Sequence, residues 1–194
     1  LQEAYTKKRV EMGWNEKRIE NILSNKESAE RVYYILEKQG YKKIFGNSKE
    51  ELYVDHQKYI LSVKSSLPDH IEAFEVENKI IKTMIKESQK VISLNCGNGI
   101  LEMNLPQEVV AIDNKKENIE DATYNAKALG KDNIRFVYGD SLKKMVPFAK
   151  KKDYDTVIIR GINRISDELK DTLRLGKVKT VIYVNSSTSM LAKD

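Results

Sequence analysis

The sequence has little cysteine or histidine and no long apolar run. Its single cysteine, Cys96, excludes an intramolecular disulfide and a cysteine-rich zinc site. The two histidines, His56 and His70, stand apart from each other, so we expect no metal site. No stretch of about eighteen apolar residues occurs, so we expect no membrane-spanning helix and no membrane partner. The chain begins at Leu1, and no signal-peptide pattern follows.

A strong charge of either sign is also missing. The 194 residues hold 34 Lys and Arg against 29 Asp and Glu, which gives a net charge of +5. This small excess is compatible with weak affinity for the phosphates of RNA, and equally with an ordinary solvated surface. The basic runs Lys7-Lys8-Arg9 and Lys150-Lys151-Lys152 leave the same two interpretations open. With 40% hydrophobic residues, the chain can bury one compact core.

Residues 1–70 are expected to form a mostly helical N-terminal extension. Asn15 is a suitable cap for a helix that runs through Leu23. Ser28 could cap a second helix through Gln39, and Gly40 is a natural end for it.

The extension also contains a possible short hairpin. Leu52–Val54 and Tyr59–Val63 flank a polar stretch, as the two strands of a hairpin do. Ser48 and Glu51 match a capping box, so a helix start competes with the hairpin at this point.

Residues 71–194 are expected to form a single α/β domain. A helix from about Glu72 to Glu87 opens it, with Val76, Ile80 and Met84 in an apolar stripe. Short β-branched runs then recur, with helical segments between several of them. They are 91–94, 109–112, 134–137, 156–159 and 180–184. This alternation predicts a doubly wound, mainly parallel sheet of the Rossmann-like type.

The first strand of this domain leads into a glycine turn, Asn95 to Gly99. Gly97 and Gly99 allow the backbone to turn tightly and to approach a ligand. The second strand ends at Asp113, whose carboxylate could accept both hydroxyls of a ribose, and the third ends at Asp140, a common place for contacts to adenine. Together they indicate a nucleoside site. A plain turn and ordinary polar strand ends remain the alternative interpretation.

These segments resemble one family, the RNA (uracil-5-)-methyltransferases. The family's first strand typically reads Leu-Asp-Leu-Tyr-Cys-Gly-x-Gly, where residues 92–99 read Ile-Ser-Leu-Asn-Cys-Gly-Asn-Gly. Its Ala-x-x-Asn-Ala stretch matches residues 122–126, and its Phe-Phe-Gln-Val-Asn matches residues 73–77. Its Tyr-Val-Ser-Cys-Asn-Pro-x-Thr-Leu-Ala-Arg-Asp matches residues 183–194. The resemblance covers about residues 70–194 and implies the fold of SAM-dependent methyltransferases.

The chemistry that the resemblance implies is not matched residue by residue. In the family, a cysteine thiolate adds to C6 of uracil, SAM methylates C5, and a carboxylate removes the C5 proton. Ser186 stands at the position of that cysteine, and a serine hydroxyl is far less acidic than a thiol. Cys96 lies in the glycine turn and is not the family's nucleophile, and the family's general base lies beyond the segment that ends at Asp194.

The cofactor pocket departs from the family as well. Arg160 stands for the acid of the family's Asp-Pro-Pro-Arg, and Ser93 for the acid of the first strand. Glu75 replaces a Gln that would meet the carboxylate of SAM, so like charges would repel. The helix after the glycine turn is expected to be trimmed. We therefore treat Gly97, Asn98, Gly99, Asp113, Asp140 and Glu75 as vestigial cofactor residues. No bound cofactor is expected, unless the pocket still admits SAM.

Three functions follow from these observations. The leading hypothesis is a catalytically inactive RNA methyltransferase-like protein, kept as an RNA-binding or structural component of a ribonucleoprotein. Its partners would be rRNA or tRNA and neighbouring proteins, in an intracellular setting such as a cytoplasmic or mitochondrial ribosome. The alternative is an active SAM-dependent RNA (uracil-5-)-methyltransferase or another RNA methyltransferase. The third is a subunit that activates a catalytic partner, for which a large exposed apolar patch would be the sign.

Overall fold

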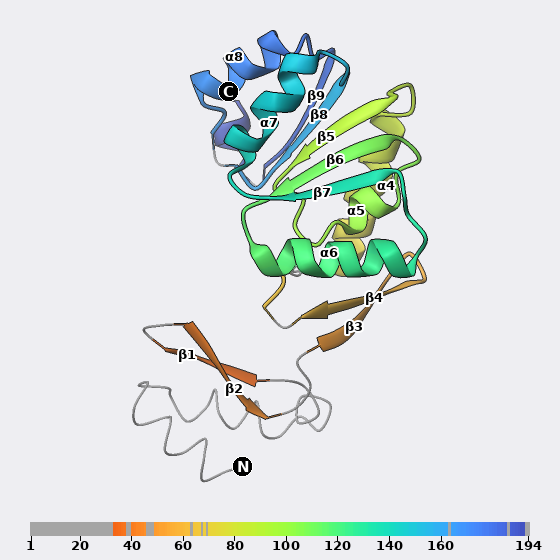
Figure 1. The fold of residues 1–194 in the computed structure, drawn as a ribbon, viewed down its shortest axis with the longest axis vertical. Coiled ribbons are helices and arrows are strands. Elements are labelled where there is room, and N and C mark those ends of the chain that lie inside the picture. Colours follow the sequence, from red (N-terminus) through yellow and green to blue (C-terminus); the bar gives the residue numbers. More distant parts are fainter. Residues whose placement is uncertain are drawn as a thin grey trace. The chain divides into compact units, whose positions relative to one another are not determined.

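The computed structural model describes residues 33–37, 40–45, 49–62, 64–66, 68, 70–162, 164–185 and 187–192. The chain divides into two compact units, residues 1–50 and 51–194, and each is described by itself. In the first unit, β1 (Tyr33–Glu37) and β2 (Gly40–Phe45) pair as an antiparallel hairpin (Figure 1).

The second helix expected in the N-terminal extension is wrong where the structure describes it. Tyr33–Glu37 is a strand, because its aromatic and β-branched side chains suit a strand at least as well as a helix face. Gly40 begins the partner strand and does not end a helix. The first expected helix, Asn15 to Leu23, lies outside the described residues, as does the basic run 7–9.

The hairpin predicted before residue 70 is confirmed. Strands β3 (Lys49–Val54) and β4 (Gln57–Ser62) pair with each other, so no helix begins at Lys49. The turn consists of Asp55 and His56, whose φ angles of 47° and 63° both lie in the left-handed region. Two-residue hairpin turns of this kind normally favour glycine or asparagine, and here aspartate and histidine take the same conformation.

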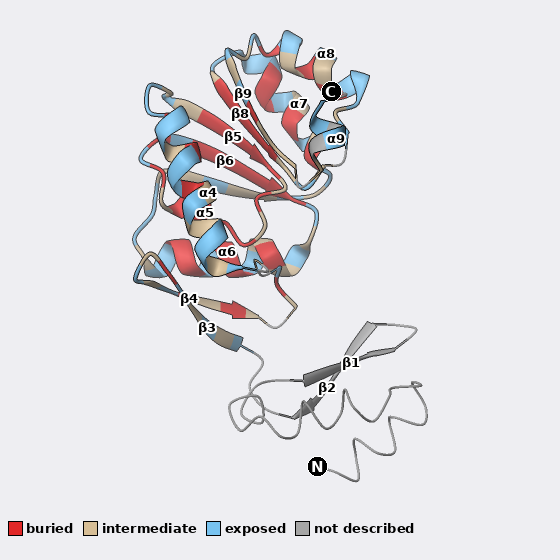
Figure 2. Cartoon of the chain, turned by 180° about the vertical axis from the view of Figure 1, so that it is seen from behind, coloured by how far each residue is buried: buried red, intermediate tan, exposed pale blue. Residues whose placement is uncertain are grey.

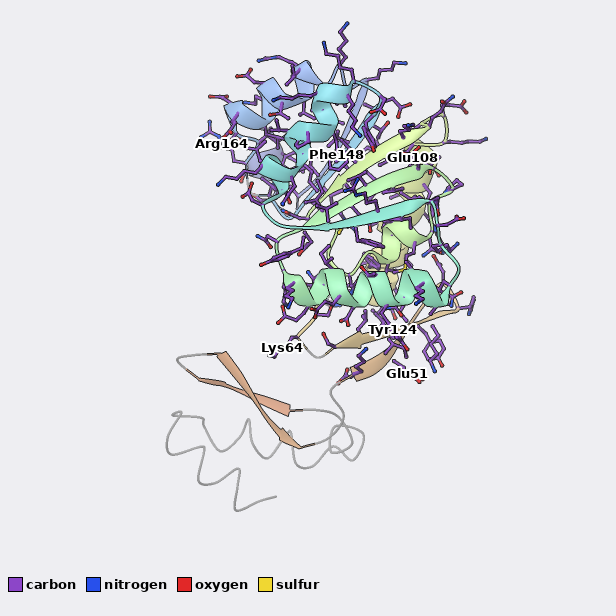
Figure 3. The ribbon with its side chains drawn as sticks, viewed as in Figure 1. Glu51, Lys64, Glu108, Tyr124, Phe148 and Arg164 are labelled. Atoms are coloured by element: carbon purple, nitrogen blue, oxygen red, sulfur yellow. The ribbon has the colours of Figure 1, made fainter. Side chains whose placement is uncertain are left out.

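The hairpin of β3 and β4 packs beneath helix α6 (Lys116–Ala128). Buried Tyr59 and Leu61 of β4 share an apolar cluster with Ala126 of α6. The amide of Asn125 continues the strand pairing, because its Oδ1 accepts from Ile60 N and its Nδ2 donates to Ile60 O, both at 2.8 Å. Tyr124 lies on the side of α6 that faces the hairpin (Figure 3). The Ala-x-x-Asn-Ala stretch thus fastens the hairpin to the domain.

All five strands predicted after residue 90 are present and pair in parallel. They are β5 (Lys90–Leu94), β6 (Glu108–Asp113), β7 (Ile134–Tyr138), β8 (Thr156–Arg160) and β9 (Thr180–Val184). Their order in the sheet is β7-β6-β5-β8-β9, with β5 in the centre (Figure 1). The chain therefore winds outward from β5 in both directions, as the doubly wound prediction requires.

Helices cover both faces of the sheet. Helices α4 (Ile71–Met84) and α5 (Ile100–Met103) pack on one face through Ile81 and Leu101. Helices α7 (Ser141–Lys151) and α8 (Asp167–Leu175) pack on the other face through Phe148 and Leu169. The three inner strands, β5, β6 and β8, are almost wholly buried, whereas the edge strands β7 and β9 are partly exposed (Figure 2).

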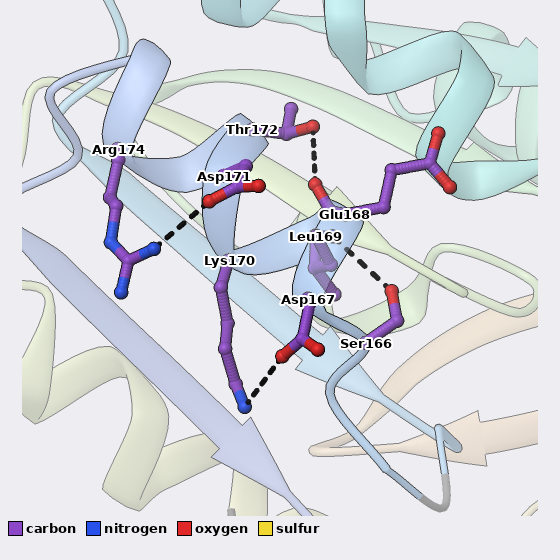
Figure 4. Close-up of polar contacts among 8 residues, drawn as sticks. All are labelled: Ser166, Asp167, Glu168, Leu169, Lys170, Asp171, Thr172 and Arg174. Carbon is purple, nitrogen blue, oxygen red and sulfur yellow. Dashed lines mark hydrogen bonds and ion pairs between the residues drawn. The ribbon is translucent and has the colours of Figure 1, made fainter.

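Local hydrogen bonds define the start of α8 (Figure 4). Ser166 is its cap, and the Ser166 Oγ accepts a hydrogen bond from Leu169 N at 3.2 Å. Exposed ion pairs join Lys170 to Asp167 at 3.5 Å and Arg174 to Asp171 at 2.9 Å. Both pairs lie within α8 and on its surface, so each is expected to contribute little to stability.

The apolar stripe of α4 faces away from the core. Val76, Ile80 and Met84 are 55%, 55% and 58% exposed, while Ile81 of the same helix is 2% exposed. The stripe lines a groove of about 690 Å³ whose opposite wall is the outer strand β9, including Val181. The apolar periodicity therefore predicts the helix α4 correctly, but it does not tell which apolar side chains of the helix face the sheet.

Two expected absences can be examined in the described residues. None of the helices there is both long enough and apolar enough to cross a membrane. The same part of the chain contains no group of three or more His, Cys, Asp or Glu side chains arranged to hold a metal ion.

Candidate cofactor site

The glycine turn between β5 and α5 uses its two glycines differently. Both have left-handed φ angles, 61° at Gly97 and 73° at Gly99. A Cβ atom on Gly99 would lie 2.5 Å from the ring of Phe136 and 3.1 Å from Ala122 Cβ, so packing requires glycine there. A Cβ atom on Gly97 would meet nothing within 4 Å, so the backbone at Gly97 borders open space. The turn is thus closed on the side of Gly99 and accessible at Gly97.

Asp113, at the end of β6, holds this turn in place through hydrogen bonds to backbone N–H groups. Its Oδ2 accepts a hydrogen bond from Gly97 N at 2.9 Å, and its Oδ1 accepts from Lys115 N at 2.8 Å and from Asn118 Nδ2 at 3.0 Å. The residue is only 5% exposed. A carboxylate has about four acceptor positions, so these bonds leave little capacity for both hydroxyls of a ribose. The ribose role predicted for Asp113 stays a prediction, and its role in holding the turn is visible.

Asn98 and Asn118 bind the segment that leads out of the hairpin. Asn98 Nδ2 donates to Ser66 O at 2.7 Å, and Ser66 N donates to Asn118 Oδ1 at 2.7 Å. Both amides are almost fully buried, so the side chain of Asn98 is engaged within the protein. The sequence pattern around Ser66 and around Asn118 does not predict this hydrogen bond, because the two residues are far apart in the chain and meet only in the folded protein.

Asp140 lies beside Asp113 at the next strand end. Gly139 N donates to Asp113 O at 2.9 Å, which brings the two strand ends together. Asp140 is exposed and caps α7, where its Oδ1 accepts from Lys143 N at 2.9 Å. We call Gly97, Asp113, Asn118 and Asp140 the nucleoside wall, because they line the carboxyl ends of β5, β6 and β7, where such folds bind nucleosides.

A second wall, formed by α4 and β8, carries opposite charges. Arg160, at the end of β8, forms an ion pair with Glu77 of α4, and its guanidinium lies 5.2 Å from the ring centre of Phe74. The side chain of Arg160 is 14% exposed and that of Glu77 is 33% exposed. Asn95 Nδ2 donates to Arg160 O at 3.0 Å and so joins this charged wall, which consists of Phe74, Glu77 and Arg160, to the glycine turn.

Glu75 does not belong to the charged wall. Its Oε1 accepts a hydrogen bond from Asp55 N at 2.8 Å, in the turn between β3 and β4. Residues two apart on a helix point in widely different directions, so Glu75 and Glu77 cannot share one face. The expectation that Glu75 opposes the carboxylate of SAM stays a prediction, and Glu77 is the acid that pairs with Arg160.

Two buried groups lie behind the glycine turn. Burial raises the pKa of the Cys96 thiol well above its usual value, and the nearby carboxylates of Glu102 and Asp113 add to the rise. Glu102 of α5 is fully buried, and its Oε1 accepts a hydrogen bond from Ser93 Oγ at 2.6 Å. Helix α5, Ile100–Met103, is short, as the trimmed link in the sequence predicts. Ser186 lies outside the described residues.

Comparison with known proteins identifies the family. Residues 85–190 match the model of the family described as methyltransferase domain. A tRNA/tmRNA (uracil-C(5))-methyltransferase of Nautilia profundicola is 26% identical over 193 residues, covering 90% of this chain and 52% of the relative. The 23S rRNA (uracil(1939)-C(5))-methyltransferase RlmD of Vesicomyosocius okutanii is 26% identical over 150 residues, 72% of this chain and 34% of the relative.

Solved structures show the same fold. The Pyrococcus abyssi tRNA (uracil-54, C5)-methyltransferase in complex with S-adenosyl-L-homocysteine superposes with a TM-score of 0.68 at 18% identity, covering 80% of this chain and 39% of that one. The chain spans about half the length, or less, of the relatives named here. Since the family model covers more than half of the chain, this protein belongs to the methyltransferase domain family, and its relatives are RNA uracil-C5-methyltransferases.

Proposed function

We propose that this chain is a SAM-binding, RNA methyltransferase-like domain that does not methylate uracil C5 with its own residues. The hydrogen bond from Gly97 N to Asp113 Oδ2 at 2.9 Å is the observation that supports SAM binding most directly. It fixes the backbone of the turn while the space beside Gly97 stays open.

The residues of the nucleoside wall fit a nucleoside cofactor. The backbone at Gly97 would approach the ligand, Asp113 would offer its remaining acceptor capacity to a ribose, and the exposed Asp140 carboxylate would face the adenine. SAM would supply an activated methyl group on its sulfonium. The earlier expectation of no cofactor is thus replaced by the proposal that SAM binds, and the cofactor roles expected for Asn98 and Glu75 stay predictions.

The proposal that uracil C5 chemistry is lost rests on the thiol. A cysteine must be reachable and partly ionised to add to C6 of uracil. Cys96 is 4% exposed, and burial raises its pKa well above the usual value, so it meets neither requirement. The chain has no other cysteine. Ser186, at the family's nucleophile position, has a hydroxyl that is far less acidic than a thiol.

We further propose RNA as the partner, in a ribonucleoprotein such as a cytoplasmic or mitochondrial ribosome. The relatives named above act on tRNA, tmRNA and 23S rRNA by their names, and the net charge of +5 favours contact with phosphates. The groove between α4 and β9 supports neighbouring proteins as further partners, because its exposed apolar side chains would be buried by contact. Ile80→Lys should then release the chain from ribonucleoprotein particles in a sucrose gradient, and continued co-sedimentation would contradict the protein contact.

The second candidate is an active RNA (uracil-5-)-methyltransferase, which the names of the relatives favour. Transfer of a labelled methyl group from SAM to tRNA and 23S rRNA transcripts separates the two candidates. Our proposal expects RNA binding in a filter assay but no labelled 5-methyluridine. Formation of labelled 5-methyluridine would overturn the proposed loss of chemistry. The same product from the Cys96→Ser variant would show in addition that the reaction does not need the thiol.

A further inference from the structure

A buried carboxyl group braces the glycine turn from behind. Glu102 of α5 and Ser93 of β5 are both 0% exposed, and Ser93 Oγ donates to Glu102 Oε1 at 2.6 Å. The two residues lie nine positions apart, on either side of the turn from Asn95 to Gly99. Their hydrogen bond therefore joins the strand that enters the turn to the helix that leaves it.

The presence of an acid at residue 102 calls for a physical reason. Its neighbours in α5, Ile100, Leu101 and Met103, are apolar and at most 1% exposed. A carboxyl group buried among such residues is disfavoured relative to an apolar side chain unless its oxygens are used. The Oε2 atom has no hydrogen-bond partner in the part of the chain that the structure describes. Apolar packing alone would not select glutamate at this position.

The nature of residue 93 explains why an acid stands at residue 102. The RNA (uracil-5-)-methyltransferases, which this chain resembles, have an aspartate at the position of Ser93. In this structure a carboxylate from the helix on the other side of the turn lies within hydrogen-bond distance of the Ser93 hydroxyl. Burial raises the pKa of Glu102, and the charge of Arg160 in the charged wall and the hydrogen bond from Ser93 oppose that rise.

We propose that Glu102 is a relocated form of the first-strand acid, and that it acts as a positioning residue which holds the glycine turn in the shape that binds SAM. On this proposal the acid and the hydroxyl have exchanged positions between residues 93 and 102, so serine at residue 93 does not mean that the acid is missing. The positioning role rests on the proposed SAM binding, whereas the exchange itself concerns only the folded chain.

A cycle of four proteins tests the exchange: the unaltered chain, Ser93→Asp, Glu102→Ser and the double variant. Ser93→Asp buries two carboxyl groups together, and Glu102→Ser leaves none, so each should destabilise the chain and raise the unfolding equilibrium constant at least about tenfold. The double variant restores one acid and one hydroxyl, and its equilibrium constant should return to within about threefold of the unaltered chain. Urea unfolding followed by circular dichroism measures this. Additive losses in the double variant would overturn the exchange.

Calorimetric titration of SAM into the folded fraction of each variant tests the positioning role. We expect Glu102→Ser to weaken SAM binding about tenfold and the double variant to recover it. Equal SAM affinity in all folded variants would overturn the positioning role, because a merely structural brace would change stability alone. If the unaltered chain does not bind SAM, the proposed function fails, and the unfolding cycle still decides whether the acid was exchanged.

Discussion

The nucleoside wall and the charged wall differ in how their side chains are used. In the nucleoside wall, Asp113 and Asn118 fasten the turn and the segment around Ser66 through buried hydrogen bonds. In the charged wall, Arg160 and Glu77 meet as an ion pair in positions where the resembled family has other residue types. A residue whose buried hydrogen bonds hold the fold cannot be substituted without loss of stability. A residue that only contacts a ligand can be substituted at little cost to stability. We therefore expect the nucleoside wall to contribute more to stability than the charged wall does.

The nucleoside wall should be the more fragile of the two. Asp113→Ala removes the acceptor of three donors, the buried Asn118 Nδ2 and the partly buried Gly97 N and Lys115 N. Unpaired buried donors each cost about 1–3 kcal/mol, so we expect a loss of about 4 kcal/mol in unfolding free energy, measured by urea titration. A loss below about 1 kcal/mol would show that water satisfies these groups and that the wall is not a structural element.

The two glycines of the turn provide a matched pair. Gly99→Ala places a Cβ atom 2.5 Å from the Phe136 ring at a φ of 73°, and overpacking together with the left-handed conformation should cost about 3 kcal/mol. Gly97→Ala has the same backbone restriction but open space, so about 1 kcal/mol is expected. Equal losses in thermal or urea unfolding would contradict the distinction between a packed and an accessible glycine.

The buried acid should give stability a pH dependence. Burial raises the pKa of Glu102, so the folded chain holds its proton to a higher pH than the unfolded chain does. Stability is therefore lost as the pH rises from the ordinary carboxyl range through the raised pKa. Glu102→Gln removes this titration, so its stability relative to the unaltered chain should increase over the same interval. Parallel curves for the two proteins would show that Glu102 does not titrate with a raised pKa.

The charged wall should contribute the least to stability. Arg160→Ala breaks a partly exposed ion pair and a contact with the Phe74 ring, for which about 1 kcal/mol is expected. Arg174→Ala breaks the exposed pair of α8, where both side chains are about three-quarters exposed, and should change unfolding by less than about 0.5 kcal/mol. A loss at Arg160 as large as that at Asp113 would erase the contrast between the two walls.

The sequence predicts the elements of the second unit better than it predicts their contacts. The β-branched runs after residue 90 each form a parallel strand, because strands that helices cover on both faces need nearly continuous apolar residues. The strand Tyr33–Glu37 was predicted as a helix, since a short apolar stretch fits either period. The stripe containing Ile80 was found, but its exposure depends on which face of α4 meets the sheet.

Contacts between distant segments account for the part of the site that could not be predicted. Gly97, Asp113 and Asp140 could be located because each follows a strand, and parallel strands end at one edge. The bonds from Ser66 to Asn118 and from Ser93 to Glu102 join side chains on different elements, which no local spacing reveals. The partners of Glu75 and Glu77, which are Asp55 N and Arg160, depend on the rotation of α4, which the motif alone does not fix.

Calorimetric titration of SAM and S-adenosylhomocysteine into the purified chain tests the central claim most directly. We predict micromolar binding of both ligands, because Asp113 fixes the turn and the backbone at Gly97 borders open space. Folded protein that binds neither ligand at millimolar concentration would contradict the claim that the nucleoside wall remains a cofactor site.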